Sequence, residues 1–509
     1  MLTLKMLHGV LVMSPLTTFL LLVTFLVLLL LIVVLVQEKK QKRKLQLEKE
    51  QEGKPKLLEP PTPFKLPVIG HLHLVGGYEV PYQAFTEIGR KYGDVVKLQL
   101  GTVKCVVVNG QKNIREALVT RGHHFDSRPD FQRYRELFSG DKENSLAFCD
   151  WSETQRTRRD MLKAHTFPRS FTSNFFTLET LITKYATTLI SKIETDKPFG
   201  VKPLVLETCA NIFTNHFCSK GFEYGDESFK KLIENFDDIF NEVNQGYAAD
   251  FLPFLMPLHR NNLRRINGLT HEIRSIILDK VIEDRYDNYN GEQPKDYVES
   301  LIQYVKNNKD FSWNTALFAL EDILGGHSAV GNFLVKLFAF LANEPHVQKK
   351  IQKEIDEKIG TRDITIFDKS LTPYTEATVF EAVRLIASPI VPRVANQTSS
   401  IGEYLVEKGT VLFLNNYDLS VSDKLWDKPQ EFIPERFIKE NRLFKPEHFL
   451  PFGGGRRSCM GYKMVQLISF GLLGRLMQKF TIEADDKFKI PIGSLALPMD
   501  TFKFRFVRR

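Results

Sequence analysis

Residues 452–461 read Phe-Gly-Gly-Gly-Arg-Arg-Ser-Cys-Met-Gly and set a single cysteine, Cys459, between glycines and ahead of an apolar helical pattern. Glycine lets backbone approach a ligand closely, and N–H groups aimed at sulfur favour the thiolate. A side chain at Gly461 would collide with a large planar group lying over the start of the next helix. Arg457 could pair with carboxylates at the rim of that group. The stretch predicts a cysteine thiolate beneath a flat, charged cofactor; the alternative is a glycine-rich turn around a buried, inert cysteine.

The spacing of this stretch resembles the haem-binding signature of cytochromes P450, F-x-x-G-x-R-x-C-x-G. The fixed positions are met in turn by Phe452, Gly455, Arg457, Cys459 and Gly461. The resemblance implies haem b (iron protoporphyrin IX) with Cys459 as the metal ligand. It also implies that Phe452, Arg457 and Gly461 bind the cofactor. Thiolate ligation favours O–O cleavage. The implied fold is mainly α, a cytochrome P450 fold with small peripheral β-sheets.

Length and composition favour one large domain. The chain has 509 residues, of which 43% are hydrophobic and 40 are phenylalanine, enough for a single large core. Length alone would allow about two to four domains, but no internal repeat divides the chain. We therefore expect a catalytic P450 domain over residues 59–509. Five widely spaced cysteines without a C-x-x-C or zinc spacing indicate a reducing compartment.

An uncharged apolar run, residues 16–36, precedes a basic cluster at residues 39–44. As a helix this run would span about 31 Å, enough for the hydrocarbon core of a bilayer. It is too long for a cleaved secretory signal, and the basic residues place the C-terminal side in the cytosol. We expect a short lumenal N-terminus (1–15), a transmembrane anchor (16–36) and a charged linker (37–58), in the endoplasmic reticulum membrane. Nucleic-acid binding, the other common use of a basic cluster, is not expected.

Periodicity organises the remainder of the chain. Helical patterns dominate residues 151–357, and strand patterns occur at residues 95–100 and 104–108 and again after Val391. The apolar stretch 251–258, broken by two prolines, falls where microsomal P450s place a loop that dips into the bilayer. A buried interhelical loop explains this stretch almost as well.

Two further stretches resemble P450 elements that reach the haem propionates. Trp151 begins the pattern W-x-x-x-R, in which the arginine contacts a propionate, but Gln155 stands at the arginine position. Arg156 could substitute, although it points about 100° further round the helix; a solvated basic face is the alternative. Arg393, which follows a proline, is expected to be another propionate partner.

An E-x-x-R pair, Glu381 and Arg384, lies on one helix face because its members are three residues apart. Arg436 supplies the second arginine of the P450 pattern. Together the three predict a buried charge network that fixes the segment leading to Cys459. Its role would be structural, through the geometry of the haem pocket.

The central helix departs from the P450 pattern [AG]-G-x-[DE]-T. Gly325 and Gly326 fit, but Ser328 and Ala329 stand where the acid and the alcohol are expected. Oxygen activation needs protons, which the usual threonine and carboxylate deliver. Ala329 has no group that can deliver a proton. We therefore expect Ser328 or His327 to relay protons through water, or a hydroxyl of the substrate to relay them instead. The alternative is that His327 and Ser328 only pack or cap the helix.

The stretches 325–332 and 457–462 resemble one subgroup, the insect Spook and Spookier P450s of ecdysteroid synthesis. The resemblance implies a membrane-bound haem-thiolate monooxygenase acting on a lipophilic sterol precursor. Electrons would come from NADPH through NADPH–cytochrome P450 reductase, with cytochrome b5 as a further partner. Three alternatives stay open: an O2-independent isomerase or dehydratase on an oxygenated sterol, a general lipophile or xenobiotic monooxygenase, and a non-catalytic haem- or sterol-binding protein.

Overall fold

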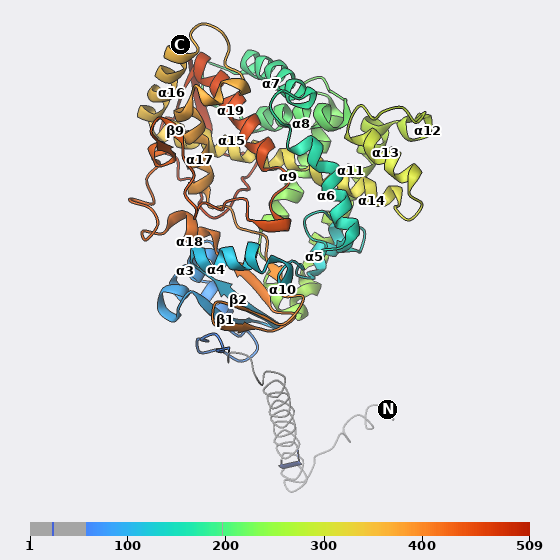
Figure 1. Ribbon diagram of the computed structural model, residues 1–509, viewed down its shortest axis with the longest axis vertical. Helices are drawn as coiled ribbons and strands as arrows, with labels where there is room; N and C mark the ends of the chain where they lie inside the picture. The colour runs from blue at the N-terminus through green and yellow to red at the C-terminus, as the bar shows by residue number, and fades with distance from the viewer. Residues whose placement is uncertain (1–22, 25–56, 196) are drawn as a thin grey trace, which may run out of the picture. The chain divides into compact units, whose positions relative to one another are not determined.

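The computed structural model describes residues 23–24, 57–195 and 197–509. The chain divides into two units, Met1–Leu58 and Glu59–Arg509. The expected lumenal segment, anchor and linker belong to the first unit. Apart from residues 23–24 and 57–58, they lie outside the described residues. The second unit is built mainly of helices (Figure 1).

The α-helices of the second unit are α2 (Leu72–Val75), α3 (Pro81–Tyr92), α4 (Gln111–Arg115), α5 (Gln132–Leu137), α6 (Glu153–Thr166), α7 (Ser173–Lys192), α8 (Lys202–Cys218), α9 (Glu227–Asn244), α10 (Ala248–Phe251), α11 (Arg260–Ile276), α12 (Arg285–Asn288), α13 (Tyr297–Asn307), α14 (Trp313–Leu324), α15 (Gly326–Asn343), α16 (Pro345–Lys358), α17 (Pro373–Ile386), α18 (Asn416–Val421) and α19 (Tyr462–Lys479). Tighter 3₁₀ turns are η2 (Gly122–His124), η3 (Lys142–Asn144), η4 (Pro253–His259), η6 (Ile366–Ser370), η7 (Pro434–Phe437) and η8 (Gly455–Arg457). Wider π turns are η1 (Glu116–Thr120) and η5 (Ile277–Ile282).

The strands are β1 (Val95–Leu100), β2 (Val103–Val108), β3 (Phe199–Gly200), β4 (Arg393–Val394), β5 (Ser399–Ile401), β6 (Tyr404–Val406), β7 (Val411–Leu414), β8 (Ile438–Lys439), β9 (Arg442–Leu443), β10 (Phe480–Glu483) and β11 (Lys503–Arg508). Within the described residues they form sheets ordered β1-β2-β7-β4, β10-β11-β3, β5-β6 and β8-β9. A mainly helical fold with small sheets, as the sequence predicts, is confirmed.

The largest of these sheets joins segments distant in sequence. The hairpin of β1 and β2 turns at Gly101, whose φ of +53° favours glycine. Strand β2 runs parallel to β7, and β7 pairs antiparallel with β4. Within β4, the amide of Val394 donates to the carbonyl of Ser127 at 2.8 Å, outside the named strands of the sheet. This last contact brings the residue after Ser127 beside Arg393, which matters for the site.

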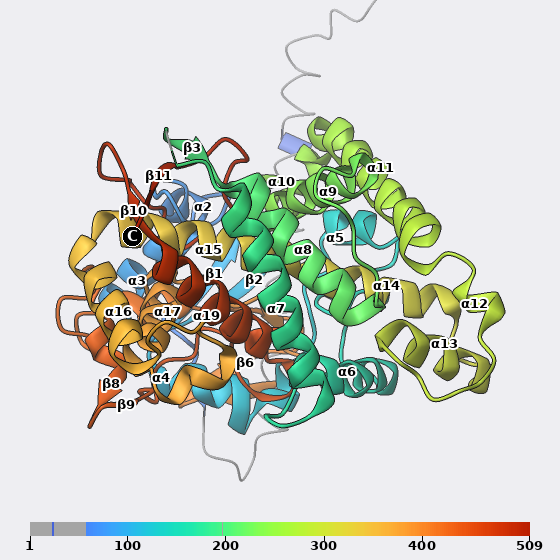
Figure 2. The ribbon, with the colours of Figure 1, turned by 90° about the horizontal axis from the view of Figure 1, so that it is seen from above.

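Helix α15 lies in the core and packs against α8, α17 and α19. Its residues are apolar on nearly every side, the pattern of a helix surrounded by protein. Figures 1 and 2 both show α15 enclosed among α8, α17 and α19. Within the described residues, Trp313–Asn343 (α14 with α15) is the stretch long and apolar enough to cross a membrane, but most of it is buried within the fold. It is therefore best understood as a core helix.

The predicted charge network lies on α17 and η7. Arg384 donates from Nε and Nη2 to the two carboxylate oxygens of Glu381, each at 2.8 Å. Arg436 Nε donates to the same carboxylate at 3.3 Å. Arg384 also donates to the carbonyls of Ser420 and Pro429, at 2.6 and 2.8 Å. Bidentate pairing and carbonyl partners satisfy the buried guanidinium, so the network holds the segment that leads toward Cys459.

Candidate active site

Cys459 lies between η8 and α19, and its amide donates to the Phe452 carbonyl at 3.0 Å. Although Cys459 is solvent-exposed, desolvation by the surrounding protein raises the pKa of its thiol, while backbone N–H groups of Gly461 and Tyr462 and the Arg159 guanidinium lower it. The two amides stand at the N-terminal end of α19, where a helix favours negative charge. The fold therefore supplies donors that would stabilise a metal-bound thiolate, although burial keeps the pKa of the free thiol raised.

Cys459 differs from the other cysteines of the chain in exposure. Cys105, Cys149, Cys209 and Cys218 are buried, whereas Cys459 is exposed. The pKa of each buried thiol is raised, as it is at Cys459, but the buried thiols also lack access for a large ligand. Cys459 is thus the thiol with both access and local donors, as a metal ligand requires.

The glycines of the signature serve two purposes. Gly455 has a φ of +66°, and a Cβ there would lie 2.1 Å from the carbonyl oxygen of Leu118, so backbone geometry requires glycine. Gly461 has a φ of −91°, which any residue can adopt, and a Cβ there would meet no described atom within 4 Å. Because neither backbone nor neighbours require glycine at 461, the space beside it fits a bound planar group.

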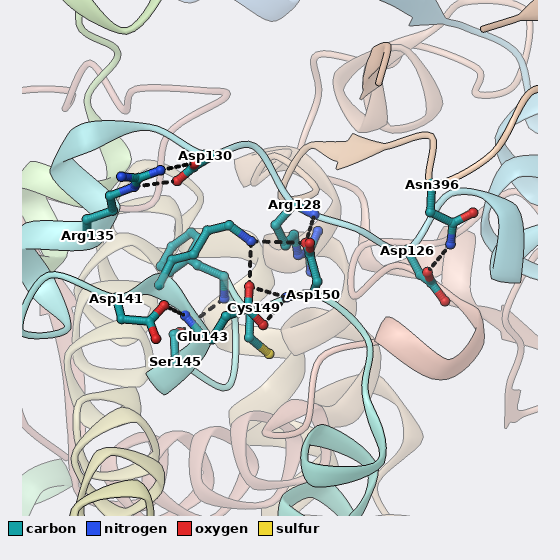
Figure 3. Close-up of polar contacts among 12 residues, drawn as sticks. Asp126, Arg128, Asp130, Arg135, Asp141, Glu143, Ser145, Cys149, Asp150 and Asn396 are labelled. Carbon is teal, nitrogen blue, oxygen red and sulfur yellow. Dashed lines mark hydrogen bonds and ion pairs between the residues drawn. The ribbon is translucent and has the colours of Figure 1, made fainter. Parts of the chain in front are cut away.

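Three buried arginines, Arg128, Arg393 and Arg457, gather near the cysteine loop. Arg128 donates from Nε to the Ala147 carbonyl at 2.8 Å, and Arg457 donates from Nη2 to the Cys149 carbonyl at 2.7 Å. Arg393 Nη2 lies 3.5 Å from the Arg457 carbonyl. Within the described residues, none of the three guanidiniums forms an ion pair, and Nε of Arg393 and of Arg457 has no hydrogen-bond partner. Figure 3 shows Arg128 beside Cys149 and Asp150.

The electrostatics of this arginine cluster call for an anion. Burial lowers the pKa of Arg393 to about 9, with Arg457 adding to the effect and the Asp126 carboxylate opposing it. Burial also lowers the pKa of Arg128, and Arg393 and Arg457 lower it further. Clustered buried cations are costly unless negative charge compensates them. The two carboxylates of a haem would supply that charge, so the residues present fit the cofactor that the signature implies.

Arg128 was not found from the sequence. Its neighbours Ser127 and Pro129 form no recognised motif. It reaches the cluster only because Ser127 pairs with β4, the strand that carries Arg393. A long-range strand contact of this kind leaves no local signal.

Helix α6 directs Arg156 and Arg159 to different surroundings. Arg156 is 63% exposed along its side chain and lies 3.6 Å from Glu153 and 3.8 Å from Asp160, so it does not join the arginine cluster. The helical rotation per residue explains the difference, since it turns Arg156 to the surface. Arg159 Nη2 donates instead to the Ser458 carbonyl at 2.7 Å. The role of Arg156 at a propionate stays a prediction, and Arg159 is a residue of this helix that contacts the cysteine loop.

Trp151 precedes α6, and Gln155 lies in the first turn of this helix. The guanidinium of Arg456 sits 4.6 Å from the Trp151 ring centroid, and the same guanidinium pairs with Asp126. Gln155, which occupies the usual arginine position, is buried and donates from Nε2 to the Leu146 carbonyl at 2.6 Å. The roles of Trp151 and Phe452 at the haem stay predictions.

The central helix is interrupted at Gly325, between α14 and α15. His327 donates from Nδ1 to the Leu324 carbonyl at 2.7 Å, which leaves Nε2 as an acceptor 3.5 Å from Ser328 Oγ. Burial lowers the pKa of His327 to about 4, so the ring is neutral near pH 7. Both side chains are buried, while Ala329 is half-buried. Proton transfer by His327 or Ser328 stays a prediction, and a neutral His327 could act only as an acceptor.

A carboxyl that the sequence motifs did not single out lies one turn earlier, on α14. Asp322 Oδ2 accepts hydrogen bonds from Ser145 Oγ at 3.0 Å and from the Leu146 amide at 2.6 Å. Burial nevertheless raises its pKa to about 6, with Arg158 opposing the rise. The loop that bonds Asp322 also supplies the Ala147 and Cys149 carbonyls to the arginine cluster. Asp322 and the arginines are therefore linked through one short loop.

Comparison with known proteins agrees with this geometry. A family model described as Cytochrome P450 matches residues 60–506. The chain is 37% identical over 480 residues to Cytochrome P450 307a1 of Drosophila melanogaster, covering 88% of each chain. It is 29% identical to a steroid 17-alpha-hydroxylase/17,20 lyase of Rana dybowskii, covering 84% of this chain and 85% of that one. It is 28% identical to Cytochrome P450 1A2 of Mesocricetus auratus, covering 86% and 87%.

Proposed function

The chain belongs to the cytochrome P450 family and is a P450 monooxygenase, and on that premise we propose that it oxidises a sterol precursor in insect moulting-hormone (ecdysteroid) synthesis. The similarity to an insect P450 and to steroid 17-alpha-hydroxylases supports a steroid substrate. The observation that carries the chemistry is the accessible Cys459 thiol, surrounded by the Gly461 and Tyr462 amides and the Arg159 guanidinium.

Haem b would be held from two sides by residues of this chain. Cys459 ligates the iron, and the arginine cluster binds the carboxylates at the edge of the porphyrin. Gly461 leaves room for the flat ring. When bound, the haem would supply the redox chemistry that activates O2 for oxidation of the substrate. The buried Arg393 and Arg457, with free Nε donors, orient the cofactor and exclude water from its edge.

Membrane attachment and electron supply belong to the same proposal. The protein would sit in the endoplasmic reticulum membrane with its catalytic unit in the cytosol, anchored by residues 16–36. It would receive electrons from NADPH through NADPH–cytochrome P450 reductase, and cytochrome b5 could contribute. The apolar turn η4 supports contact with lipid, because Phe254 and Leu258 are 63% and 79% exposed.

Ala329 favours a second candidate function. An O2-independent isomerase or dehydratase would need no proton relay to oxygen, and Ala329 removes the usual alcohol. A general lipophile monooxygenase is the third candidate, since the chain is also 28% identical to Cytochrome P450 1A2, whose name specifies no steroid. A sterol-processing monooxygenase is preferred because the relatives include steroid 17-alpha-hydroxylase/17,20 lyases, 29% and 28% identical to the chain.

One experiment separates these candidates. The full-length protein is co-expressed with its reductase in microsomes and given oxygenated and unoxygenated sterols under 18O2. Labelled product that requires NADPH supports oxygenation of a sterol. Unlabelled product formed without NADPH would establish the isomerase or dehydratase. Turnover of unrelated lipophiles with no sterol product would favour the general monooxygenase.

A further inference from the structure

A closed ring of hydrogen bonds joins α8, α9, α15 and the segment between β10 and β11. Asn332 Nδ2 donates to Asp237 Oδ1 at 2.7 Å. Lys202 Nζ donates to Asp237 Oδ2 and to the Leu497 carbonyl, each at 2.6 Å. The Leu497 amide closes the ring by donating to Asn332 Oδ1 at 3.0 Å. We name Lys202, Asp237, Asn332 and the Leu497 backbone the α15 ring.

The α15 ring is buried and internally neutral. All of its members are buried, and each carboxylate oxygen of Asp237 has a donor. A buried ion pair adds little stability over apolar side chains of similar volume, because desolvation offsets the attraction. Hydrogen bonds of fixed length and direction do, however, set the relative positions of the segments they join. The ring is therefore better suited to fixing geometry than to adding stability.

The ring reaches the interrupted turn of the central helix. Asn332 Nδ2 also donates to the Ser328 carbonyl at 2.8 Å. That turn is irregular, since the Ser328 amide bonds to the Gly325 carbonyl, three residues back, at 3.2 Å. The Asp237 carboxylate faces His327 closely enough to oppose the effect of burial on its pKa. The ring therefore bonds to the backbone of Ser328, which stands at the expected acid position, and its Asp237 charge acts on the neighbouring His327.

We propose that Lys202, Asp237 and Asn332 are positioning residues that hold the Gly325–Ala329 turn in place over the haem. The central helix lacks the usual acid–alcohol pair. The ring fixes the backbone of its Gly325–Ala329 turn through the hydrogen bond from Asn332 to the Ser328 carbonyl. The inference rests on haem binding by the family fold and not on the identity of the substrate. None of the three side chains is assigned a contact with haem or substrate.

The test measures the infrared C–O stretch of carbon monoxide bound to the reduced, full-length protein in detergent, because this band responds to the polar field on the side of the haem that faces α15. Two variants open the ring: Asn332→Leu, and the double variant Lys202→Met with Asp237→Leu, which leaves no buried charge unpaired. Both variants are expected to shift or broaden the C–O band relative to wild type. This change is expected whether or not the variants unfold at a different temperature from wild type.

Lys336→Met is the matched control. Lys336 is also a buried lysine of α15, and its Nζ donates to the carbonyls of Pro491 and Ser494 at 2.7 and 2.5 Å, in the same segment as Leu497. It does not contact the Ser328 turn. The C–O band of Lys336→Met should match that of wild type, even though the segment between β10 and β11 loses two hydrogen bonds. The proposal is overturned if both ring variants keep the wild-type band, or if Lys336→Met changes it equally. If Asn332→Leu does not fold, the C–O band of the double variant, Lys202→Met with Asp237→Leu, alone tests the proposal. Sterol turnover is not part of the readout, so a wrong substrate assignment leaves this test unaffected.

Discussion

Replacing Asp322 by asparagine gives a defined pH-dependent change in stability. The Asp322 carboxyl is held by Ser145 Oγ and the Leu146 amide, at 3.0 and 2.6 Å, yet burial raises its pKa from 3.8 to about 6. Desolvation of the charged form outweighs the hydrogen bonds and the Arg158 guanidinium, which both lower the pKa. Asparagine has nearly the same shape, keeps an acceptor for the Leu146 amide and cannot titrate.

The sign follows from proton binding. Between about pH 4 and pH 6 the folded protein holds a proton on Asp322 that the unfolded chain has lost, so the free energy of unfolding rises as the pH falls through 6. A pKa change from 3.8 to about 6 corresponds to about 3 kcal/mol in full. Between pH 7 and pH 4.5 the Asp322 contribution amounts to about 2 kcal/mol.

The assay is denaturant unfolding of the full-length holoprotein at both pH values, for wild type and Asp322→Asn. Wild type should gain about 2 kcal/mol relative to the variant on going from pH 7 to pH 4.5. Asp310→Asn, which alters an exposed carboxyl just before α14, serves as control and should follow wild type. A difference between wild type and Asp322→Asn that does not change with pH would refute the reasoning.

Three further substitutions test other parts of the structure. Arg393→Leu should weaken haem binding, measured by haem titration, at least about tenfold, because a charge-assisted hydrogen bond contributes about 1.5–3 kcal/mol. Arg156→Leu is the control and should leave the haem titration unchanged. An equal loss of haem affinity in both variants would contradict the placement of Arg156 at the surface. Arg384→Leu should lower the free energy of unfolding by about 3 kcal/mol, because Glu381 loses its bidentate partner. Exposed ion pairs contribute less than about 1 kcal/mol, so a loss below that value would contradict a buried network. Gly455→Ala should cost about 1–3 kcal/mol through its positive φ, measured by thermal unfolding, and a neutral effect would argue against that backbone.

The predictable parts of the site are those with local spacing. The signature at 452–461 and the E-x-x-R pair are each short enough for their geometry to follow from neighbouring positions. The predicted contact between Glu381, Arg384 and Arg436 is confirmed, although Arg436 is distant in sequence, because the family pattern supplied it. Mainly helical content with small sheets likewise followed from periodicity and resemblance.

What the sequence did not disclose depends on contacts between distant segments. Arg128 joins the arginine cluster through a strand pairing, and Lys202 meets Asp237 only where α8, α9 and α15 pack together. The contact of Arg159 with the Ser458 carbonyl likewise depends on how α6 packs against the cysteine loop. The low pKa of His327 also depends on its burial, which its sequence neighbours do not specify.

The central claim is that Cys459 is the thiolate ligand of a haem, and the spectrum of the reduced, CO-bound protein tests it most directly. Wild type should show the red-shifted Soret band of thiolate-ligated haem. Cys459→His should retain haem but lose that band, because imidazole replaces sulfur on the iron. An unchanged red-shifted band in Cys459→His, with haem still bound, would contradict the assignment.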